Sequence, residues 1–186
     1  MTPLTATERA ALLGIARAAI LAKVAGAPPR EVPVPGEGAL AEVRGAFVSV
    51  HVGGELRGCV GTFQPTEPLA RTVARMAVAA ASEDPRFPPL EAADVALLSI
   101  SVSALGPLRP LPEPRAVRVG EDGLLIRRGW HRGALLPQVA VEHGWSAEEF
   151  LKHVCLKAGL PARAWQEPGA ELAAFPAEEC SEEPNP

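Results

Sequence analysis

The stretch that indicates the fold most clearly is AFVSVHVGGELRGCVG, residues 46–61. Residues 46–52 alternate apolar side chains with small or polar ones, and Gly53-Gly54 follows directly, which is typical of a β-hairpin. A three-residue turn over Gly53–Glu55 keeps apolar and polar residues on separate faces, whereas a two-residue turn mixes them, so we predict the longer turn. The predicted cross-strand pairs are Val52–Leu56, Val50–Gly58 and Val48–Val60 on the apolar face, and His51–Arg57 and Ser49–Cys59 on the polar face.

Three amphipathic helices are predicted around this hairpin. Residues 5–8 form a capping box, and apolar residues then recur at helical spacing until Gly26. A second helix over residues 68–83 carries a buried stripe and ends at the Asp-Pro pair that follows. A second capping box, residues 146–149, begins a third helix that stops at Gly159.

Further strands complete an α+β fold. Residues 95–105 alternate Leu, Ile and Val with Ser, which indicates a strand with one buried face and one small, hydroxyl-bearing face. Residues 124–126 and 134–136, separated by a turn over 129–133, indicate a second hairpin. The remaining segments are predicted to be Pro-rich loops at 27–38 and 106–114, a short last strand at 170–175 and a frayed acidic tail at 178–186. We therefore predict a two-layer fold with a mainly antiparallel sheet packed by three main helices.

The composition is that of an ordinary globular chain. Its 186 residues, 47% apolar and 22% charged, are enough for one core or two small lobes. The absence of an apolar run of about 18 residues, and of a basic-then-apolar N-terminus, leads us to expect a cytoplasmic protein without a membrane span. A net charge of −4 disfavours binding through many phosphates. Twenty Pro and a single Asn would suit a thermophile, although a GC-rich genome would explain them equally well.

Motifs for metals and common cofactors are not found in the sequence. The three cysteines are too widely spaced for a zinc ribbon or an iron–sulfur cluster. No dinucleotide-binding glycine motif, Walker A lysine, nucleophile elbow or HExxH pair is present. We predict that this chain alone carries no metal and no cofactor.

Six sequence blocks stand in an order that resembles one protein family. They are LRGCVG (56–61), DPRF (84–87), ISVS (100–103), LLPQVA (135–140), GW (144–145) and CLKAGLP (155–161). Together they are similar to the AMME syndrome chromosomal region family, whose prokaryotic members are called AmmeMemoRadiSam system protein A. The resemblance covers residues 12–175, and the chain departs from the family's hallmark LRGCIG only at Val60, a volume-conserving change.

The resemblance implies an organisation and a setting for the protein. It implies a single family domain over residues 1–186 with two lobes, the larger from both termini and the smaller from the central segment. By gene neighbourhood it implies association with a Memo-type protein and a radical S-adenosylmethionine enzyme. It implies no known activity.

Cys59 is the leading candidate for chemistry. The neighbouring Gly58 and Gly61 would let a ligand or another chain approach the backbone beside the sulfur. Arg57 and His51 would flank the thiol on the polar face, and cationic neighbours lower the pKa of a thiol and enrich the reactive thiolate. The alternative is that Cys59 is a small buried residue in a tightly packed hairpin that needs its glycines for packing.

Arg57 and Arg86 are candidate anion ligands, because a guanidinium binds carboxylate or phosphate groups bidentately. The alternative for each arginine is an ion pair within the chain. For Arg57, the expected partners of such a pair are Glu67, Glu83 or Asp84. If both arginines meet in one cleft, an anionic ligand is favoured.

Gln138 follows Pro137 in an apolar segment that we predict to be a strand. Fixing a turn is the favoured role of its amide, and contact with a ligand is the second. His131, His143 and His153 lack metal-ligand spacing, so we predict solvated or capping roles for them.

Three functions are compatible with these residues. In the first, the protein is an enzyme or enzyme component in which Cys59 is the nucleophile, redox thiol or acyl carrier, His51 its proton partner, and Arg57 or Arg86 the clamp for a small anion. In the second, it is a noncatalytic adaptor that docks on the Memo-type or radical enzyme through the hairpin surface. Nucleic-acid modification ranks last, because of the net charge and the absence of Tyr among few aromatic residues. The first is favoured, because Arg, Cys and paired glycines form a combination that a hairpin alone does not need.

Overall fold

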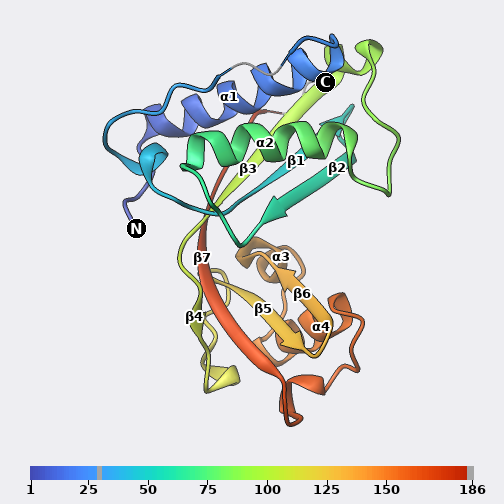
Figure 1. Cartoon of the computed structure of the whole chain (residues 1–186). Helices are drawn as coiled ribbons and strands as arrows, with labels where there is room; N and C mark the ends of the chain where they lie inside the picture. The colour runs from blue at the N-terminus through green and yellow to red at the C-terminus, as the bar shows by residue number, and fades with distance from the viewer. Residues whose placement is uncertain (29–30, 184–186) are drawn as a thin grey trace. The chain divides into compact units, whose positions relative to one another are not determined.

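The structure is a computed structural model that describes residues 1–28 and 31–183. The fold is α+β, with antiparallel strands packed by helices, as the sequence predicts. The chain divides into two compact units: unit 1 comprises Met1–Leu105 and Glu178–Pro186, and unit 2 comprises Gly106–Ala177 (Figure 1). Over the described residues, no helix combines the length and the apolar character needed to cross a bilayer.

The sheet of unit 1 is centred on β1 (Ala46–Val52). This strand pairs antiparallel with β2 (Glu55–Thr62) on one side and with β3 (Leu98–Leu105) on the other. The last strand, β7 (Glu171–Ser181), pairs with β3 and gives the order β2-β1-β3-β7. Residues of β1 alternate between buried and partly exposed, so the sheet has one core face and one more polar face.

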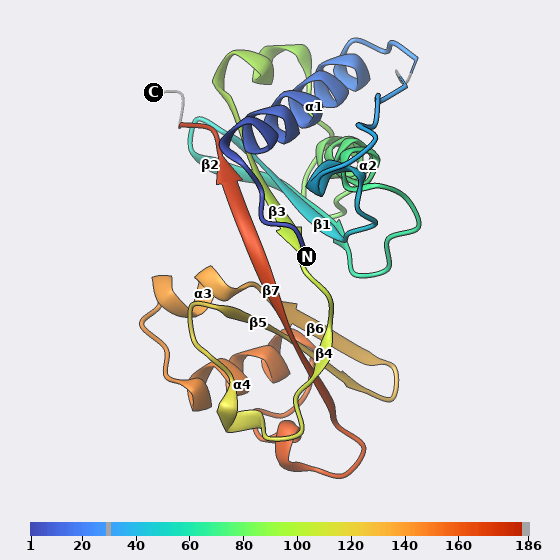
Figure 2. The same ribbon diagram turned by 90° about the vertical axis from the view of Figure 1, so that its left-hand side faces the viewer.

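Two long helices cover the core face. α1 (Ala6–Val24) begins at the predicted capping box, in which Thr5 and Glu8 cap each other's backbone N–H groups. α2 (Leu69–Ser82) carries the predicted buried stripe. The two helices lie side by side, as Figures 1 and 2 show from two directions. Their shared core with the sheet includes Leu12, Ala16, Ile20, Leu69, Val73, Met76, Val48, Val50, Ile100 and Val102.

The turn between β1 and β2 is shorter than predicted. Gly53 and Gly54 alone form it, with φ values of 58° and 82° that suit a type I′ turn. The expected pairs of Val50, Ser49 and Val48 are confirmed, but His51 pairs with Leu56 instead of Arg57. The cause is a bulge: Arg57 is an extra residue in β2, which restores the segregation of apolar and polar faces beyond it.

The third strand of unit 1 also begins later than predicted. Residues 92–97 form a 3-10 helix, and β3 starts at Leu98. Glu91 and Asp94 cap this 3-10 helix reciprocally, and these side-chain bonds to the backbone favour the helical turn over an extended start of the strand. A second 3-10 helix, Ala39–Ala41, follows the Pro-rich segment 27–38, of which residues 29–30 lie outside the described part.

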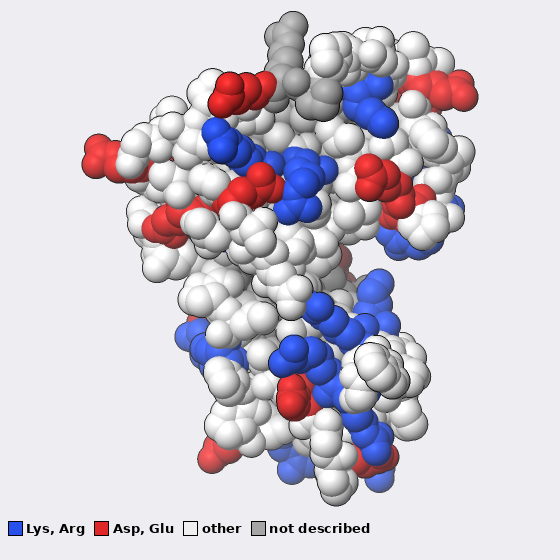
Figure 3. Space-filling view, viewed as in Figure 1, with Lys and Arg blue, Asp and Glu red and all other residues white. Residues whose placement is uncertain are grey.

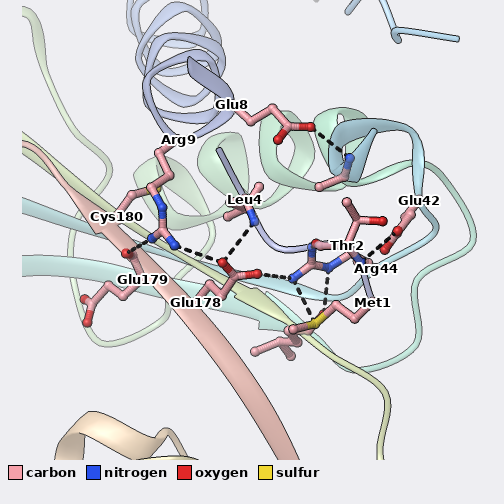
Figure 4. Close-up of polar contacts among 12 residues, drawn as sticks. Met1, Thr2, Leu4, Glu8, Arg9, Glu42, Arg44, Glu178, Glu179 and Cys180 are labelled. Carbon is pink, nitrogen blue, oxygen red and sulfur yellow. Dashed lines mark hydrogen bonds and ion pairs between the residues drawn. The ribbon is translucent and has the colours of Figure 1, made fainter. Parts of the chain in front are cut away.

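The tail predicted to fray over residues 178–186 is ordered over 178–181 as part of β7, so the prediction is wrong there; residues 184–186 lie outside the described part. Figure 4 shows the reason. The carboxylate of Glu178 accepts hydrogen bonds from Arg9 at 2.8 Å, from the Leu4 backbone at 3.0 Å and from Arg44 at 3.3 Å. Arg44 is buried and also donates to the carbonyl oxygens of Thr2 and Leu105. Through this network the end of β7 is connected to the N-terminal residues Thr2 and Leu4 and to Leu105 at the end of β3.

Unit 2 contains a second antiparallel sheet. β5 (Asp122–Arg128) pairs with β6 (His131–Leu135) on one side and with β7 on the other, and the two-residue β4 (Arg109–Pro110) also pairs with β7. α4 (Ala147–Lys157) begins at the predicted capping box of residues 146–149. The core of the unit comprises Leu111, Val117, Leu124, Ile126, Ala140, Phe150, Leu151, Val154, Cys155, Ala158, Leu160, Ala164 and Ala174.

Two expectations for unit 2 are wrong. The hairpin turn consists of Gly129 and Trp130 alone rather than residues 129–133, because the strands extend toward it on both sides. Residues 137–142 form a short helix, α3 (Pro137–Glu142), rather than a strand. Proline at the first helical position is preorganised for a helix, which outweighs the apolar pattern there.

Candidate functional site

The candidate site lies on the face of the unit 1 sheet opposite the two long helices. A side chain added at Gly58 would overlap the carbonyl oxygen of Ala80 in α2, so Gly58 faces the helix. Because neighbouring residues in a strand point to opposite faces, Cys59 faces away from α2. Its cross-strand neighbour Ser49 is paired in turn with Ser101 of β3. The result is a row of small polar side chains across three strands.

The Cys59 thiol is half-buried and hydrogen-bonded. The Ser49 hydroxyl donates to Cys59 Sγ at 3.3 Å. The Cys59 backbone N–H donates to Oδ2 of Asp84 at 2.8 Å, on the side of β2 that no strand of the described chain pairs. The Cys59 side chain is therefore hydrogen-bonded to a hydroxyl, and its backbone is fixed by a carboxylate.

The two motif glycines have packing roles. Gly58 permits the close approach of α2 described above, and a side chain at Gly61 would overlap the ring of Phe47. Phe47 in turn packs edge-on against Phe63, with ring centroids 5.1 Å apart. The space beside each glycine is therefore filled by the protein itself.

Asp84 and Arg86 form the polar support of Cys59. The Asp84 side chain is 4% exposed, and it accepts from Arg86 Nε at 2.9 Å and Nη2 at 2.7 Å. These bonds, with the Cys59 backbone N–H, hold the pKa of the Asp84 carboxyl well below its usual range, against the opposing effect of burial. The pKa of Arg86 is raised above its ordinary value, mainly because the guanidinium donates hydrogen bonds to Asp84. Arg86 remains 51% exposed and reachable from solvent.

Arg57, the bulge residue, does not join Arg86 on the same carboxylate. It forms an ion pair with Asp94 at 3.5 Å. Asp94 is none of the three partners of Arg57 expected from the sequence. Of those three, Asp84 pairs with Arg86 and Glu67 pairs with Arg75. The capped 3-10 helix that holds Asp94 was not predicted, which is why this partner was missed.

His51 lies on the same face of β1 as Ser49, two residues further along. It is half-buried opposite Leu56 and Ser99. Burial lowers the pKa of the imidazole below its ordinary value, because desolvation disfavours the charged form. At neutral pH His51 is therefore a neutral base beside the Cys59–Ser49 row.

Gln138 lies elsewhere, near the start of α3 in unit 2. The expected capping role fits His131, whose Nδ1 lies 3.1 Å from the carbonyl oxygen of Ala158 at the end of α4. His143 and His153 stack on the two sides of Trp145, with ring centroids at 4.7 Å and 3.9 Å. Within the described residues, no group of three His, Cys, Asp or Glu side chains is arranged to hold a metal ion.

The other two thiols differ from Cys59. Cys155 is fully buried in the core of unit 2, and Cys180 donates to the carbonyl oxygen of Val102 in unit 1. Burial raises the pKa of Cys155 and raises that of Cys180 to about 11. Both are therefore protonated and poorly nucleophilic at neutral pH.

The residues of this site belong to a recognised family pattern. The sequence profile of the AMMECR1 family matches residues 13–180, which include the whole β1–β2 hairpin and the Asp84–Arg86 support. The chain belongs to the AMMECR1 family. The match covers both units, so the family pattern describes the fold as a whole as well as the hairpin.

Relatives of this AMMECR1 protein occur in archaea, many of them thermophiles. A protein of Methanothermobacter thermautotrophicus is 41% identical over 182 residues, covering 95% of each chain. A protein of Thermococcus gammatolerans is 46% identical over 133 residues, covering 69% of this chain and 65% of its own. The crystal structure of the uncharacterized protein PH0010 from Pyrococcus horikoshii matches with a TM-score of 0.85 and 36% identity, covering 93% of this chain and 90% of that one. The names of these three relatives state no activity.

Proposed function

We propose that the protein is an enzyme or enzyme component of an AmmeMemoRadiSam-type system, with a thiol-centred site for a small anionic ligand in unit 1. Cys59 is the nucleophile or acyl carrier, and His51 accepts the thiol proton. Arg86 attracts the negative charge of the ligand, and so does Arg57 in the bulge of β2. The Memo-type protein and the radical S-adenosylmethionine enzyme are the proposed partners of the system.

The observation that carries this proposal is the contrast among the three thiols. Cys59 is the half-buried one: its sulfur accepts from the Ser49 hydroxyl at 3.3 Å, and its backbone N–H donates to Asp84, the carboxylate that Arg86 binds. Partial exposure lets a ligand or reagent reach the Cys59 sulfur, whereas Cys155 and Cys180 are buried. Neutral His51 on the same face supplies a proton acceptor.

Both arginines already have carboxylate partners, and this bears on how a ligand would bind. Asp84 is buried and holds Arg86 by two side-chain bonds, so Arg86 keeps its place and offers its remaining N–H groups. The Arg57–Asp94 contact is long, at 3.5 Å, and a ligand carboxylate or phosphate would exchange for Asp94 at little cost.

The adaptor hypothesis is the second candidate. It is supported by the same ion pairs, because arginines that are already neutralised attract a free anion less strongly. It is also supported by Leu56, an exposed apolar residue beside the β1–β2 turn. On this hypothesis Cys59 is inert and the hairpin surface is the anchor for a partner protein.

The test compares two alkylating agents of similar shape and different charge, iodoacetate and iodoacetamide. We would measure both rates at Cys59 in a Cys155→Ala/Cys180→Ala background, in native protein and in urea. An anion site predicts a rate ratio of iodoacetate to iodoacetamide about fivefold higher in the native protein than in urea, the effect of one unit charge at roughly 4 Å in water. Arg86→Gln should abolish this preference.

Arg71→Gln provides the matched control, because Arg71 is an exposed arginine on α2 whose ion-pair partner is Glu31. It should leave the ratio unchanged. A reactive Cys59 without charge preference would reject the anionic ligand but keep the nucleophile. An unreactive Cys59 would reject the enzyme hypothesis and favour the adaptor.

A further inference from the structure

The tip of the β5–β6 hairpin in unit 2 carries an unusual residue. Trp130 occupies the second position of the two-residue turn and is 102% exposed. Gly129 precedes it with φ 57°, as the first central position of a type II′ turn requires. The turn chemistry is satisfied by Gly129, and its second position usually takes a small polar residue. The indole is therefore not needed for the turn.

The other two tryptophans of the chain are both partly covered by side chains of unit 2. Trp145 lies between His143 and His153, and Trp165 has the guanidinium of Arg115 over its ring at 5.8 Å. An indole presents an apolar area of about 150–250 Å². Leaving that apolar area in water at the tip of a hairpin is unfavourable, and a partner that covers it would remove this cost.

The charge around the tip is uniformly positive in sequence. Residues 127–132, RRGWHR, hold three arginines and a histidine and no acidic residue. The register pairs Arg128 with His131 and Arg127 with Arg132, so two guanidinium groups stand directly opposite each other in the second pair. Such pairs weaken a hairpin. Figure 3 shows Lys and Arg side chains gathered on this face of unit 2.

Carboxylates of the same chain already offset the charge of Arg127 and Arg128. Arg127 pairs with Glu171 at 3.0 Å, where both side chains are largely exposed, and Arg128 pairs with Glu167. Exposed pairs of this kind contribute little free energy, so the carboxylates of a partner would replace them readily.

We propose that the β5–β6 tip is a docking anchor for an acidic surface of a partner protein. Trp130 fills an apolar pocket of the partner, and Arg127, Arg128 and Arg132 face carboxylates around that pocket. Trp and Arg are the residues that most often dominate binding energy at protein interfaces. The opposite charge of the partner follows from the six-residue basic run.

Two other occupants fit less well. Single-stranded nucleic acid needs several stacking rings along a positive groove, whereas the tip offers one indole and the chain has a net charge of −4. A second copy docking tip to tip would bring the two basic runs together, and like charges would repel.

The test reads the partner's chemistry without assuming its identity. The full chain would be used to select binders from a random 12-residue peptide display library. The proposal predicts peptides with several Asp or Glu residues around an apolar one. A synthetic peptide of that consensus should bind at least about tenfold more weakly to Trp130→Ala, and weakly also to the double variant Arg128→Gln/Arg132→Gln. Added salt should weaken binding to the wild-type chain.

Val141→Ala is the control, because Val141 is an exposed apolar residue of unit 2 outside the hairpin. It should bind the peptide as the wild type does. Binding of a fifteen-nucleotide oligo(dT) tests single-stranded nucleic acid as the occupant, and sedimentation velocity tests a second copy of the chain. The proposal is overturned if the selection enriches no acidic sequences, or if Trp130→Ala binds the peptide as tightly as the wild type. It is also overturned if Trp130→Ala instead abolishes binding of oligo(dT) or self-association of the chain.

Discussion

The two hairpins of the molecule, β1–β2 and β5–β6, share a plan and differ in where their polar groups go. Each turns through two residues, and in each a strand glycine lies against a helix or its end: Gly58 against Ala80 of α2, and Gly133 against Ala158, the C-cap of α4. In the first hairpin the glycine's neighbour is a supported thiol. In the second, the polar and aromatic residues are at the tip.

The arginines show the same difference. Arg86, beside the first hairpin, is held by Asp84, which is buried, while Arg127 in the second is held by Glu171, which is exposed. A buried carboxylate fixes the position of its arginine, and an exposed one leaves it exchangeable. The first hairpin is therefore preorganised around one side chain, whereas the second presents replaceable contacts.

The largest effect is expected from filling the space beside the strand glycines. Gly58→Ala or Gly133→Ala should each lower the free energy of unfolding by about 3 kcal/mol or more, because a helix backbone must move to make room. Gly129→Ala, at φ 57° with open space around it, should cost only about 1 kcal/mol. Urea unfolding followed by circular dichroism measures all three. Equal losses of unfolding free energy for Gly58→Ala and Gly129→Ala would mean that α2 does not pack tightly against Gly58.

A smaller difference in unfolding free energy is expected between substitutions of the two carboxylates, Asp84 and Glu171. Asp84→Asn should cost about 2 kcal/mol of unfolding free energy, because it weakens charge-assisted bonds to Arg86 and to the Cys59 backbone in a buried position. Glu171→Gln should cost less than about 0.5 kcal/mol. The same urea titrations measure both changes.

The acid limb of stability checks the Asp84 assignment independently. Its folded-state pKa is depressed, so the stabilisation is complete above the ordinary value of 3.8 and is lost as the pH falls toward the lower folded value. The wild type should therefore lose stability below about pH 4 more steeply than Asp84→Asn. Parallel acid limbs for the two proteins would contradict the proposed support of Cys59.

A milder pH dependence is expected from His51. Burial depresses its folded-state pKa, so the unfolded chain binds more protons and stability falls as the pH drops through the ordinary value of 6.5. His51→Gln should reduce the loss of stability between pH 7.5 and 5.5, by less than the Asp84 effect. Urea midpoints at the two pH values are the measurement, and an unchanged pH dependence would indicate a solvated imidazole.

The smallest effect on stability is expected at the tip. Trp130→Ala should change the free energy of unfolding by no more than about 0.5 kcal/mol, since the side chain is fully exposed. The fluorescence of the variant should lose a red-shifted, solvent-exposed component. A loss above about 1 kcal/mol would mean that the indole packs against the chain, and the two hairpins would then differ less than described.

Local signals made much of the fold predictable. The capping boxes at Thr5 and Ser146 act within four residues, so the starts of α1 and α4 follow from the sequence. The Ser49–Cys59 pair followed from strand alternation and survived the wrong turn length, because the bulge at Arg57 corrects the register beyond it. The bulge itself depends on the partner strand and is not visible in β2 alone.

Distant contacts could not be predicted. The order of β7 depends on Glu178 meeting Leu4 and Arg9, which lie 174 and 169 residues away in sequence. The support of Cys59 by Asp84 spans 25 residues and passes through a backbone N–H, which carries no residue-specific signal. The Asp84–Arg86 pair was available from its two-residue spacing, and Trp130 beside Gly129 was available as a turn residue flanked by arginines.

Alkylation by iodoacetamide measures whether Cys59 is a reachable thiol supported by Asp84 and Ser49. Cys155→Ala/Cys180→Ala protein would be treated natively across pH 6–9 and followed by intact-mass spectrometry, with His51→Gln and Arg86→Gln in parallel. We expect native Cys59 to react without unfolding, and each substitution to slow the reaction at neutral pH. Protection of Cys59 until the protein is denatured would instead show that the thiol is a packing residue.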